Sequence, residues 1–312
     1  MISPRPQLVV PARSITAPEV LELAQRAQAK GWSGFWVSEV LSLDAAVLLG
    51  ALAVQTTGMR LGTAIVPATT RSAALLAMFA STAAQLAPGR VSIGIGVSTP
   101  AIVAERHDRP AEPAAATAAG VLEVVIDALD GKRVERATNP HVSGLRIAPL
   151  GQRPPILLAA LGPRMRSVAL ERADGLVLNL VPLAEAAEIA SVAHLDRGED
   201  YEVLISQRIC VDPTADDLRS LRREIASYCR VPAYAANFAR LGVDIEPVLA
   251  ATSDDAADAI PDDLLHELVI VGSPQECRAR VDAFLSAGVT PLLAPVGAAA
   301  RTANLIDRLP TA

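Results

Sequence analysis

The sequence predicts an α/β protein whose strands close into a single (β/α)8 barrel. Three observations favour this fold: short apolar runs that alternate with helix-like stretches, a hydrophobic content of 51% with only 3% aromatic residues, and a length of 312 residues. A core built from Ala, Leu, Val and Ile is typical of helices packed on buried parallel strands. A barrel of about 250 residues or more forms one domain, so this length fits a barrel with insertions.

Eight apolar runs are expected to form the barrel strands, because each is short and most are followed by an apolar stretch with helical spacing. In chain order they are residues 8–10, 34–37, 61–66, 91–97, 155–161, 175–181, 203–211 and 290–296. A doubly wound open sheet is the alternative. It is disfavoured because no GxGxxG follows the first strand, and Gly94-Ile-Gly96 lies inside a strand without the third glycine.

Helices are predicted between these strands from apolar spacing and end signals. The predicted ranges are 17–30, 43–55, 72–86, 117–129, 164–171 and 274–287, with Ser42 as the N-cap of the second. Two segments depart from the strand–helix repeat. Residues 131–153 are predicted as an excursion with a small hairpin (133–136 with 145–147), and residues 214–266 as a helical insertion. We therefore expect one barrel domain over residues 1–312.

Charge and cysteine content restrict the partners and the compartment. The net charge of −6 argues against nucleic acid, since binding to nucleic acid needs clustered Lys and Arg. The three cysteines are far apart and form no CxxC, so a reducing compartment is expected. The first residues lack a signal-peptide pattern, and the longest apolar runs are too short to span a bilayer. The prediction is a cytoplasmic protein that binds no membrane.

The residues just after the strands define where chemistry is expected, because a barrel places its active site at the carboxyl ends of its strands. The segments to search are residues 11–14, 38–39, 65–70, 97–100, 162–163, 179–182, 210–212 and 295–297. Glu39 is the only carboxylate at the first four strand ends, and no histidine falls at any of them. Metal-assisted hydrolysis and paired-carboxylate chemistry are therefore not indicated, and no metal site is expected. Apolar, Gly, Ser, Thr and Asn residues remain, which suit a large flat cofactor that brings its own reactivity.

Six motifs, in this order along the chain, resemble the bacterial luciferase-like flavin and deazaflavin oxidoreductases. They span about residues 8–296 in total and are Gly34–Glu39, Arg60–Pro67, Gln85–Gly96, Pro154–Met165, Ala173–Asn179 and Val271–Glu276. Two of them, Ala-Leu-Gly-Pro-Arg-Met and Ala-Asp-Gly-Leu-Val-Leu-Asn, most resemble the branch that uses the deazaflavin coenzyme F420. The resemblance implies the barrel fold and a reduced coenzyme bound at the carboxyl ends of the strands.

The resemblance also implies which residues contact the coenzyme. A non-proline cis peptide is expected at Ala64-Ile65, where it forms a bulge against the back of the tricyclic ring. The full set of expected cofactor-binding residues is Ala64, Ile65, Val66, Val97, Ser98, Thr99, Ala160, Leu161, Gly162, Pro163, Arg164, Met165, Asn179 and Leu180.

Individual roles follow from the chemistry of these groups, each beside a structural alternative. Gly162, Pro163, Arg164 and Met165 open a helix, whose free N–H groups suit a phosphate; a plain Gly-Pro turn is the alternative. Asn179 is expected to bond ring or ribityl oxygens, or only to cap a turn. Hydroxyls of Ser98 and Thr99 suit the ribityl chain or a phosphate.

Arg166 and Arg172 could steer an anionic cofactor tail, although a single helical Arg is usually just solvated. Arg71 is a candidate partner for Glu39 or for a substrate anion.

The predicted function is hydride transfer between coenzyme F420 and a small organic substrate, with Glu39 and Ser38 as the candidate catalytic residues. Relatives commonly carry an acid followed by His where this chain has Glu39-Val40, and an acid where it has Thr99. A monooxygenase that uses reduced FMN is therefore kept as an alternative. So is a barrel that binds a cofactor, or serves as a subunit, without turnover. A homodimer is expected by resemblance.

Overall fold

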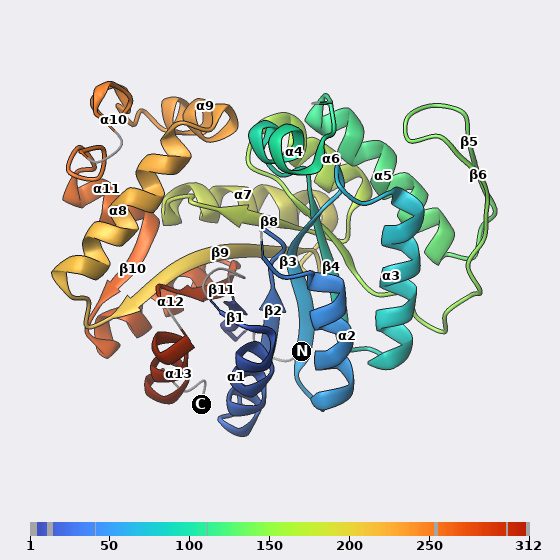
Figure 1. The fold of residues 1–312 in the computed structure, drawn as a ribbon, viewed down its shortest axis with the longest axis horizontal. Helices are drawn as coiled ribbons and strands as arrows, with labels where there is room; N and C mark the ends of the chain where they lie inside the picture. The colour runs from blue at the N-terminus through green and yellow to red at the C-terminus, as the bar shows by residue number, and fades with distance from the viewer. Residues whose placement is uncertain are drawn as a thin grey trace.

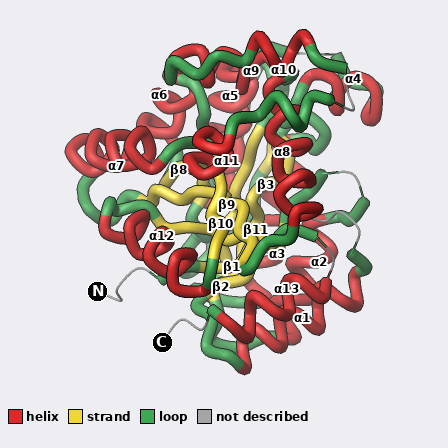
Figure 2. The backbone as a smooth tube through the Cα atoms, turned by 90° about the vertical axis from the view of Figure 1, so that its left-hand side faces the viewer, coloured by secondary structure: helices red, strands yellow, loops and turns green. Residues whose placement is uncertain are grey.

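The computed structural model describes residues 5–10, 15–40, 42–110, 112–252, 255–297 and 299–309. Eight parallel strands form a closed ring in which β8 and β9 complete the circle (Figures 1 and 2). Around the ring they follow the order β9-β11-β1-β2-β3-β4-β7-β8. Their bounds are β1 (Gln7–Val10), β2 (Gly34–Val37), β3 (Arg60–Pro67), β4 (Val91–Gly96), β7 (Ile156–Ala159), β8 (Gly175–Asn179), β9 (Glu202–Val211) and β11 (Thr290–Pro295). The predicted (β/α)8 barrel and its eight strands are confirmed.

An outer layer of helices covers the ring, as the connection between parallel strands requires. It consists of α1 (Ala17–Ala29), α2 (Ala45–Gln55), α3 (Ala73–Leu86), α5 (Ala114–Leu129), α6 (Pro163–Arg172), α7 (Leu183–Arg197), α12 (Pro274–Ser286) and α13 (Ala299–Arg308). A short helix, α4 (Pro100–His107), follows β4 directly. No helix in the described ranges is long and apolar enough to cross a membrane.

Two additions leave the barrel on opposite sides (Figure 1). One is the antiparallel hairpin of β5 (Val134–Arg136) and β6 (Val142–Leu145). The other follows β9 and contains α8 (Ala215–Cys229), α9 (Pro232–Arg240), α10 (Glu246–Ala250) and α11 (Asp262–Leu268). It ends in β10 (Val269–Gly272), which pairs with the carboxyl half of β9 outside the ring. We refer to α8–α11 as the helical segment.

Several predicted boundaries are wrong. α2 begins at Ala45 rather than residue 43, and its N-cap is Asp44 rather than Ser42, because the Asp44 carboxylate accepts the Val47 N–H at 2.9 Å. The second hairpin strand is residues 142–145 rather than 145–147. In the observed register Val134 pairs with Leu145, which leaves a shorter connection to close. The helix predicted over residues 117–129 begins at Ala114.

Three hydrophobic clusters match this layout. The largest lies between the strands and the outer helices. A second, with Leu221, Ile225, Phe238 and Leu265, is the core of the helical segment and reaches Leu180 at the end of β8. The third fills the barrel interior and consists of Val9, Trp36, Leu157, Val177, Leu204, Leu292 and Ala294.

Candidate functional site

The strand ends meet at one end of the barrel, which we call the mouth. Because neighbouring ring strands are parallel, their carboxyl ends lie on the same side. The structure thereby brings together Ser38 and Glu39 after β2, residues 97–99 after β4, residues 160–165 after β7, Asn179 at the end of β8 and Leu180 after it. The predicted segment 11–14 lies outside the described residues.

Strand β3 carries the predicted irregularity at the mouth. The peptide bond between Ala64 and Ile65 is cis, and the pairing of β3 with β4 shifts register between Thr63 and Val66. The expected bulge is therefore present. The backbone carbonyl of its Ile65 accepts the N–H of Glu39 at 3.0 Å, which ties the bulge to the end of β2.

The two glycines of β4 make room for this bulge. A Cβ on Gly94 would lie 2.2 Å from the Thr63 carbonyl oxygen, and a Cβ on Gly96 would lie 2.9 Å from the Ile65 side chain. The Thr63 hydroxyl also donates to the Gly94 carbonyl at 2.9 Å. Gly94-Ile-Gly96, which is too short for a nucleotide motif, thus lets the bulged strand approach its neighbour.

The two ends of the barrel interior are filled differently. The amino end holds large polar groups: Trp36 donates its ring N–H to Gln7 at 2.7 Å, and Arg60 contacts Ser92 and Glu202. The mouth carries small side chains instead. Ala64 packs on the inner cluster, the Cβ of Ala159 lies 3.1 Å from where a Gly96 Cβ would be, and both alanines are partly exposed. Ala64, Gly96 and Ala159 at the mouth are therefore smaller than Trp36, Gln7 and Arg60 at the amino end.

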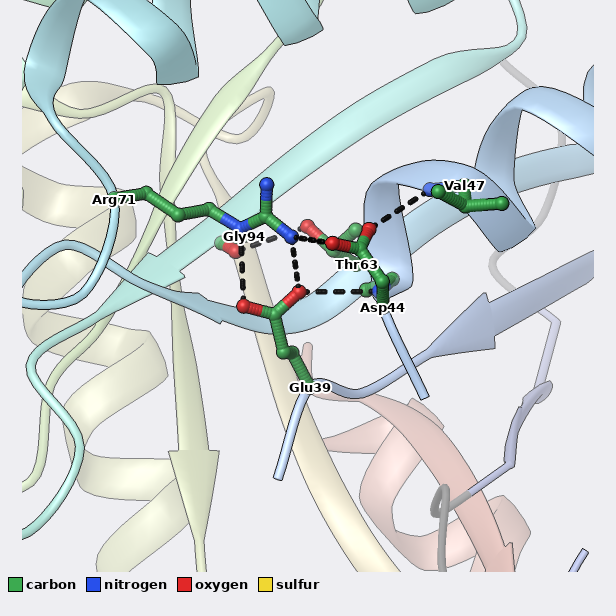
Figure 3. A network of polar contacts seen from close by, with 7 residues as sticks. Glu39, Asp44, Val47, Thr63, Arg71 and Gly94 are labelled. Carbon is green, nitrogen blue, oxygen red and sulfur yellow. Dashed lines mark hydrogen bonds and ion pairs between the residues drawn. The ribbon is translucent and has the colours of Figure 1, made fainter. Parts of the chain in front are cut away.

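An ion-pair network closes one side of the mouth (Figure 3). Arg71 donates to both oxygens of Glu39, at 3.0 and 2.6 Å, and to Asp44 at 2.5 Å. The Glu39 Oε2 also accepts the Ala45 N–H at 3.1 Å, so the same carboxylate helps to hold the start of α2. The side chains of Arg71 and Glu39 are only 12% and 16% exposed. Of the two partners considered for Arg71, the structure shows Glu39.

Electrostatics keep this network charged. The bond to Glu39 raises the pKa of Arg71 despite partial burial. Burial opposes the charge of Asp44, but the Val47 N–H and Arg71 outweigh it and hold the pKa of Asp44 below its ordinary value. Each charge has an opposite charge within hydrogen-bond reach.

The other side of the mouth is formed by Asn179 and the helical segment. The Asn179 Nδ2 donates to the Tyr234 hydroxyl on α9 at 2.7 Å. Its Oδ1 is buried and has no hydrogen-bond partner among the described residues. The helical segment therefore reaches the mouth, and one acceptor there is left unpaired.

A partly buried ion pair lies next to this contact. Arg208 of β9 donates to Glu224 of α8 at 2.7 Å and to the Ser206 hydroxyl at 3.3 Å. Ser206 is paired with Asn179 in the sheet register. Burial disfavours the charge of Arg208, but Glu224 outweighs it, so the pKa of Arg208 is raised. Sequence reasoning identified neither Arg208 nor Glu224, because neither lies at a strand end.

The start of α6 carries the predicted phosphate-binding group. Gly162 is the N-cap and makes no side-chain capping bond, Pro163 follows it, and Arg164 is exposed. Uncapped N–H groups at a helix start favour an anion. Arg166 and Arg172, expected to steer an anionic tail, are ion-paired with Glu185 at 3.0 Å and Glu123 at 3.7 Å.

Backbone conformation is also unusual at the mouth. Ser98, Leu180 and Asp212 follow β4, β8 and β9 and have positive φ angles of 60°, 51° and 49°. Left-handed conformations are uncommon for residues other than glycine, and they cluster at functional sites. Three of them at one end of the barrel indicate the same site as the side chains.

Comparison with known proteins agrees with the fold. Residues 2–291 match the family described as luciferase-like monooxygenase. A protein of Mycobacterium tuberculosis, provisionally named a coenzyme F420-dependent oxidoreductase, is 26% identical over 91% of this chain and 92% of its own.

Solved structures extend the comparison at lower identity. The coenzyme F420-dependent tetrahydromethanopterin reductase of Methanopyrus kandleri has a TM-score of 0.81 at 19% identity, over 98% of both chains. The oxygenating constituent of 3,6-diketocamphane monooxygenase from Pseudomonas putida, in complex with FMN, has a TM-score of 0.69 at 16% identity, over 98% of this chain and 97% of its own. At these identities the likeness shows the fold alone.

The fold is a (β/α)8 barrel, and its candidate site lies at the carboxyl ends of the strands. The chain belongs to the luciferase-like monooxygenase family. The Mycobacterium tuberculosis relative and a 5,10-methylenetetrahydromethanopterin reductase of Methanolobus tindarius, which is 23% identical over 89% of this chain and 91% of its own, support an oxidoreductase enzyme.

Proposed function

We propose that the protein binds coenzyme F420 at the mouth and transfers a hydride between the coenzyme and a small organic substrate. The observation that carries this proposal is the small size of three side chains at the mouth: Ala64 packs on the inner cluster, and Gly96 lies beside Ala159 and the Ile65 of the bulge. The named relative from Mycobacterium tuberculosis and the motifs around Met165 and Asn179 support the choice of coenzyme.

The residues at the mouth fit such a coenzyme. Alanine and glycine leave space for a flat ring that larger side chains would occupy. The unpaired Oδ1 of Asn179 can accept from a ring N–H or a ribityl hydroxyl. The start of α6 at Gly162 offers N–H groups and a positive helix end to a phosphate. All residues that the sequence analysis predicts to bind the cofactor are included in this proposal.

When bound, the coenzyme supplies the hydride chemistry, and the protein supplies position and surroundings. The bulge at Ala64 and Ile65 would support one face of the ring, and the β4 glycines leave room for the bulge. Glu39 follows β2 and accepts hydrogen bonds from Arg71 and from the Ala45 N–H. These bonds hold the end of β2 against the start of α2. Both Glu39 oxygens are occupied, which favours a positioning role over proton donation. Catalysis by Glu39 or by the buried Ser38 stays a prediction.

Titration of the protein with coenzyme F420 and, separately, with FMN tests the proposal. We expect coenzyme F420 to bind with a shift in its absorbance or quenching of its fluorescence. Ala159→Leu should weaken this binding at least about a hundredfold, because the new side chain fills the space above the inner core. Ala279→Leu on α12 is the matched control, because it makes the same change at an exposed position. Binding that is unchanged in Ala159→Leu contradicts this location.

A reduced-FMN monooxygenase is the second candidate, since one structural neighbour is a monooxygenase in complex with FMN. Binding of FMN without coenzyme F420 favours this candidate. A protein that binds neither coenzyme at tens of micromolar is instead a barrel without turnover.

The expected homodimer is also part of the proposal. α2 and α3 contain no charged residue, and they expose Val47, Val54, Leu75 and Met78. Contiguous exposed apolar side chains are typical of an interface. Sedimentation of the purified protein tests for a dimer, and a monomer at all concentrations contradicts it.

A further inference from the structure

The contact between Asn179 and Tyr234 joins the end of strand β8 to helix α9. The Asn179 Nδ2 donates to the Tyr234 hydroxyl oxygen at 2.7 Å, and both residues are only partly buried. Asn179 ends its strand beside Leu180, one of the residues with positive φ. The pair therefore lies at the mouth, where barrel and helical segment meet.

One hydrogen-bonding group of the pair has no protein partner. The Asn179 Oδ1 is covered from water, and no donor in the described part of the chain bonds to it. A buried acceptor without a donor destabilises the fold, so native proteins rarely retain one without a functional reason. A ligand that donates a hydrogen bond to this oxygen would remove that penalty.

Tyr234 provides a hydrogen-bond donor, whereas the Asn179 Oδ1 provides an acceptor. Its oxygen accepts from Asn179, so its own O–H proton is available to a second acceptor. Burial, aided by the neighbouring Tyr228, raises the pKa of Tyr234, so the hydroxyl keeps its proton at neutral pH.

The surroundings hold this hydroxyl in place. The Tyr228 ring packs against the Tyr234 ring with their centroids 4.5 Å apart, and the Arg208–Glu224 ion pair connects β9 to α8. Fixed polar groups recognise a ligand better than mobile ones, because less freedom is lost on binding.

We propose that Asn179 and Tyr234 together bind a ligand edge that carries an N–H donor beside a C=O acceptor. The N–H would donate to the Asn179 Oδ1, and the C=O would accept from the Tyr234 hydroxyl. This inference rests on the proposed function, since the pyrimidine ring of both deazaflavins and flavins presents such an edge. It assigns a coenzyme contact to the helical segment, outside the strand ends.

Binding and stability measured on the same variants test this assignment. The variants are Tyr234→Phe, Asn179→Leu and the double variant Asn179→Leu/Tyr234→Phe. Tyr228→Phe, which removes the same hydroxyl from the adjacent ring, is the matched control. We expect each single variant to bind coenzyme F420 about tenfold more weakly or worse, and Tyr228→Phe to bind like the wild type.

Stability of the coenzyme-free protein separates a binding role from a structural one. The double variant replaces both polar partners and removes the unpaired oxygen, so it should melt at or above the temperature of the wild type while binding poorly. A double variant that melts well below the wild type identifies the pair as a structural contact and overturns the inference.

The last experiment uses a coenzyme whose pyrimidine-ring N–H is replaced by N–CH3. This methylated coenzyme should bind the wild type weakly, and the Asn179→Leu variant should bind it no more weakly than the wild type does. If it binds like the unmodified coenzyme, the assignment of this edge is wrong. If the wild type binds neither coenzyme F420 nor FMN, the proposed function fails and this inference fails with it. If the wild type binds and Tyr234→Phe binds equally well, this inference alone fails.

Discussion

The two polar sides of the mouth differ in how completely their side chains are paired. On the β2 side, Glu39 accepts from Arg71 and from the Ala45 backbone, so both of its oxygens are used. On the β8 side, Asn179 donates once and leaves its acceptor oxygen without a partner. The carboxylate, which sequence reasoning selected for catalysis, is bonded within the scaffold. The neutral amide is the group left available to a ligand.

The two sides of the mouth therefore have different roles. The paired side fixes the end of β2, the bulge of β3 and the start of α2 relative to one another. The unpaired side, with its acceptor oxygen, is where binding energy can be gained. Substitutions on the first side should therefore reduce stability, while those on the second should reduce ligand binding.

The largest expected effect is that of Gly94→Ala, which disturbs the bulge beside the paired side. Its Cβ would lie 2.2 Å from the Thr63 carbonyl oxygen, a backbone atom that cannot move without shifting the strand. We expect the free energy of unfolding to fall by about 3 kcal/mol or more in denaturant titrations. Gly50→Ala should instead stabilise the protein by about 0.5–1 kcal/mol. Equal stabilities of the two variants would show that the bulge does not need Gly94.

Arg71→Met should have the next largest effect. It leaves the largely buried Glu39 and the nearby Asp44 without their cation, so we expect a loss of about 2 kcal/mol in the free energy of unfolding. Adding Glu39→Leu should recover most of that loss, because the unpaired charge is then gone. If the double variant is as unstable as Arg71→Met, the ion pair is not the cause.

Asp44→Asn should have the smallest effect, and its size should depend on pH. The pKa of Asp44 lies below its ordinary value of 3.8, so its carboxylate stabilises the fold above that pH, and this contribution is lost as the pH falls. Asn keeps the capping bond to Val47 but not the charge. Thermal melts should show the wild type above the variant at pH 7 and the two converging below about pH 4. A constant difference between them would contradict this role of the charge.

The fold could be predicted because its signals are local. Eight short apolar strands and the helices between them follow from periodicity, and the observed ring uses all eight. Strand β10 was not predicted, because its four residues directly follow α11 and pair outside the ring. α4 and α7 were also not assigned. The start of α2 was misplaced because Ser42 and Asp44 are both good capping residues, and only the structure shows that Asp44 is the N-cap.

The site was harder to predict, because its contacts join residues far apart in sequence. The cis peptide at Ala64-Ile65 was expected from the family resemblance and is present. Arg71 bonds Glu39 from 32 positions away, and sequence alone left its partner open. Tyr234 bonds Asn179 across 55 positions, and the sequence predicted only that its segment is a helical insertion. Which polar atoms are satisfied depends on these distant pairings.

A crystal of the protein soaked with reduced coenzyme F420 would test the central claim most directly. Our account predicts a planar three-ring density at the mouth, with one face against Ala64 and Ile65 and its pyrimidine edge at Asn179 and Tyr234. Density for the ring elsewhere on the protein, or a mouth filled by side chains that leaves no room for three fused rings, would contradict it.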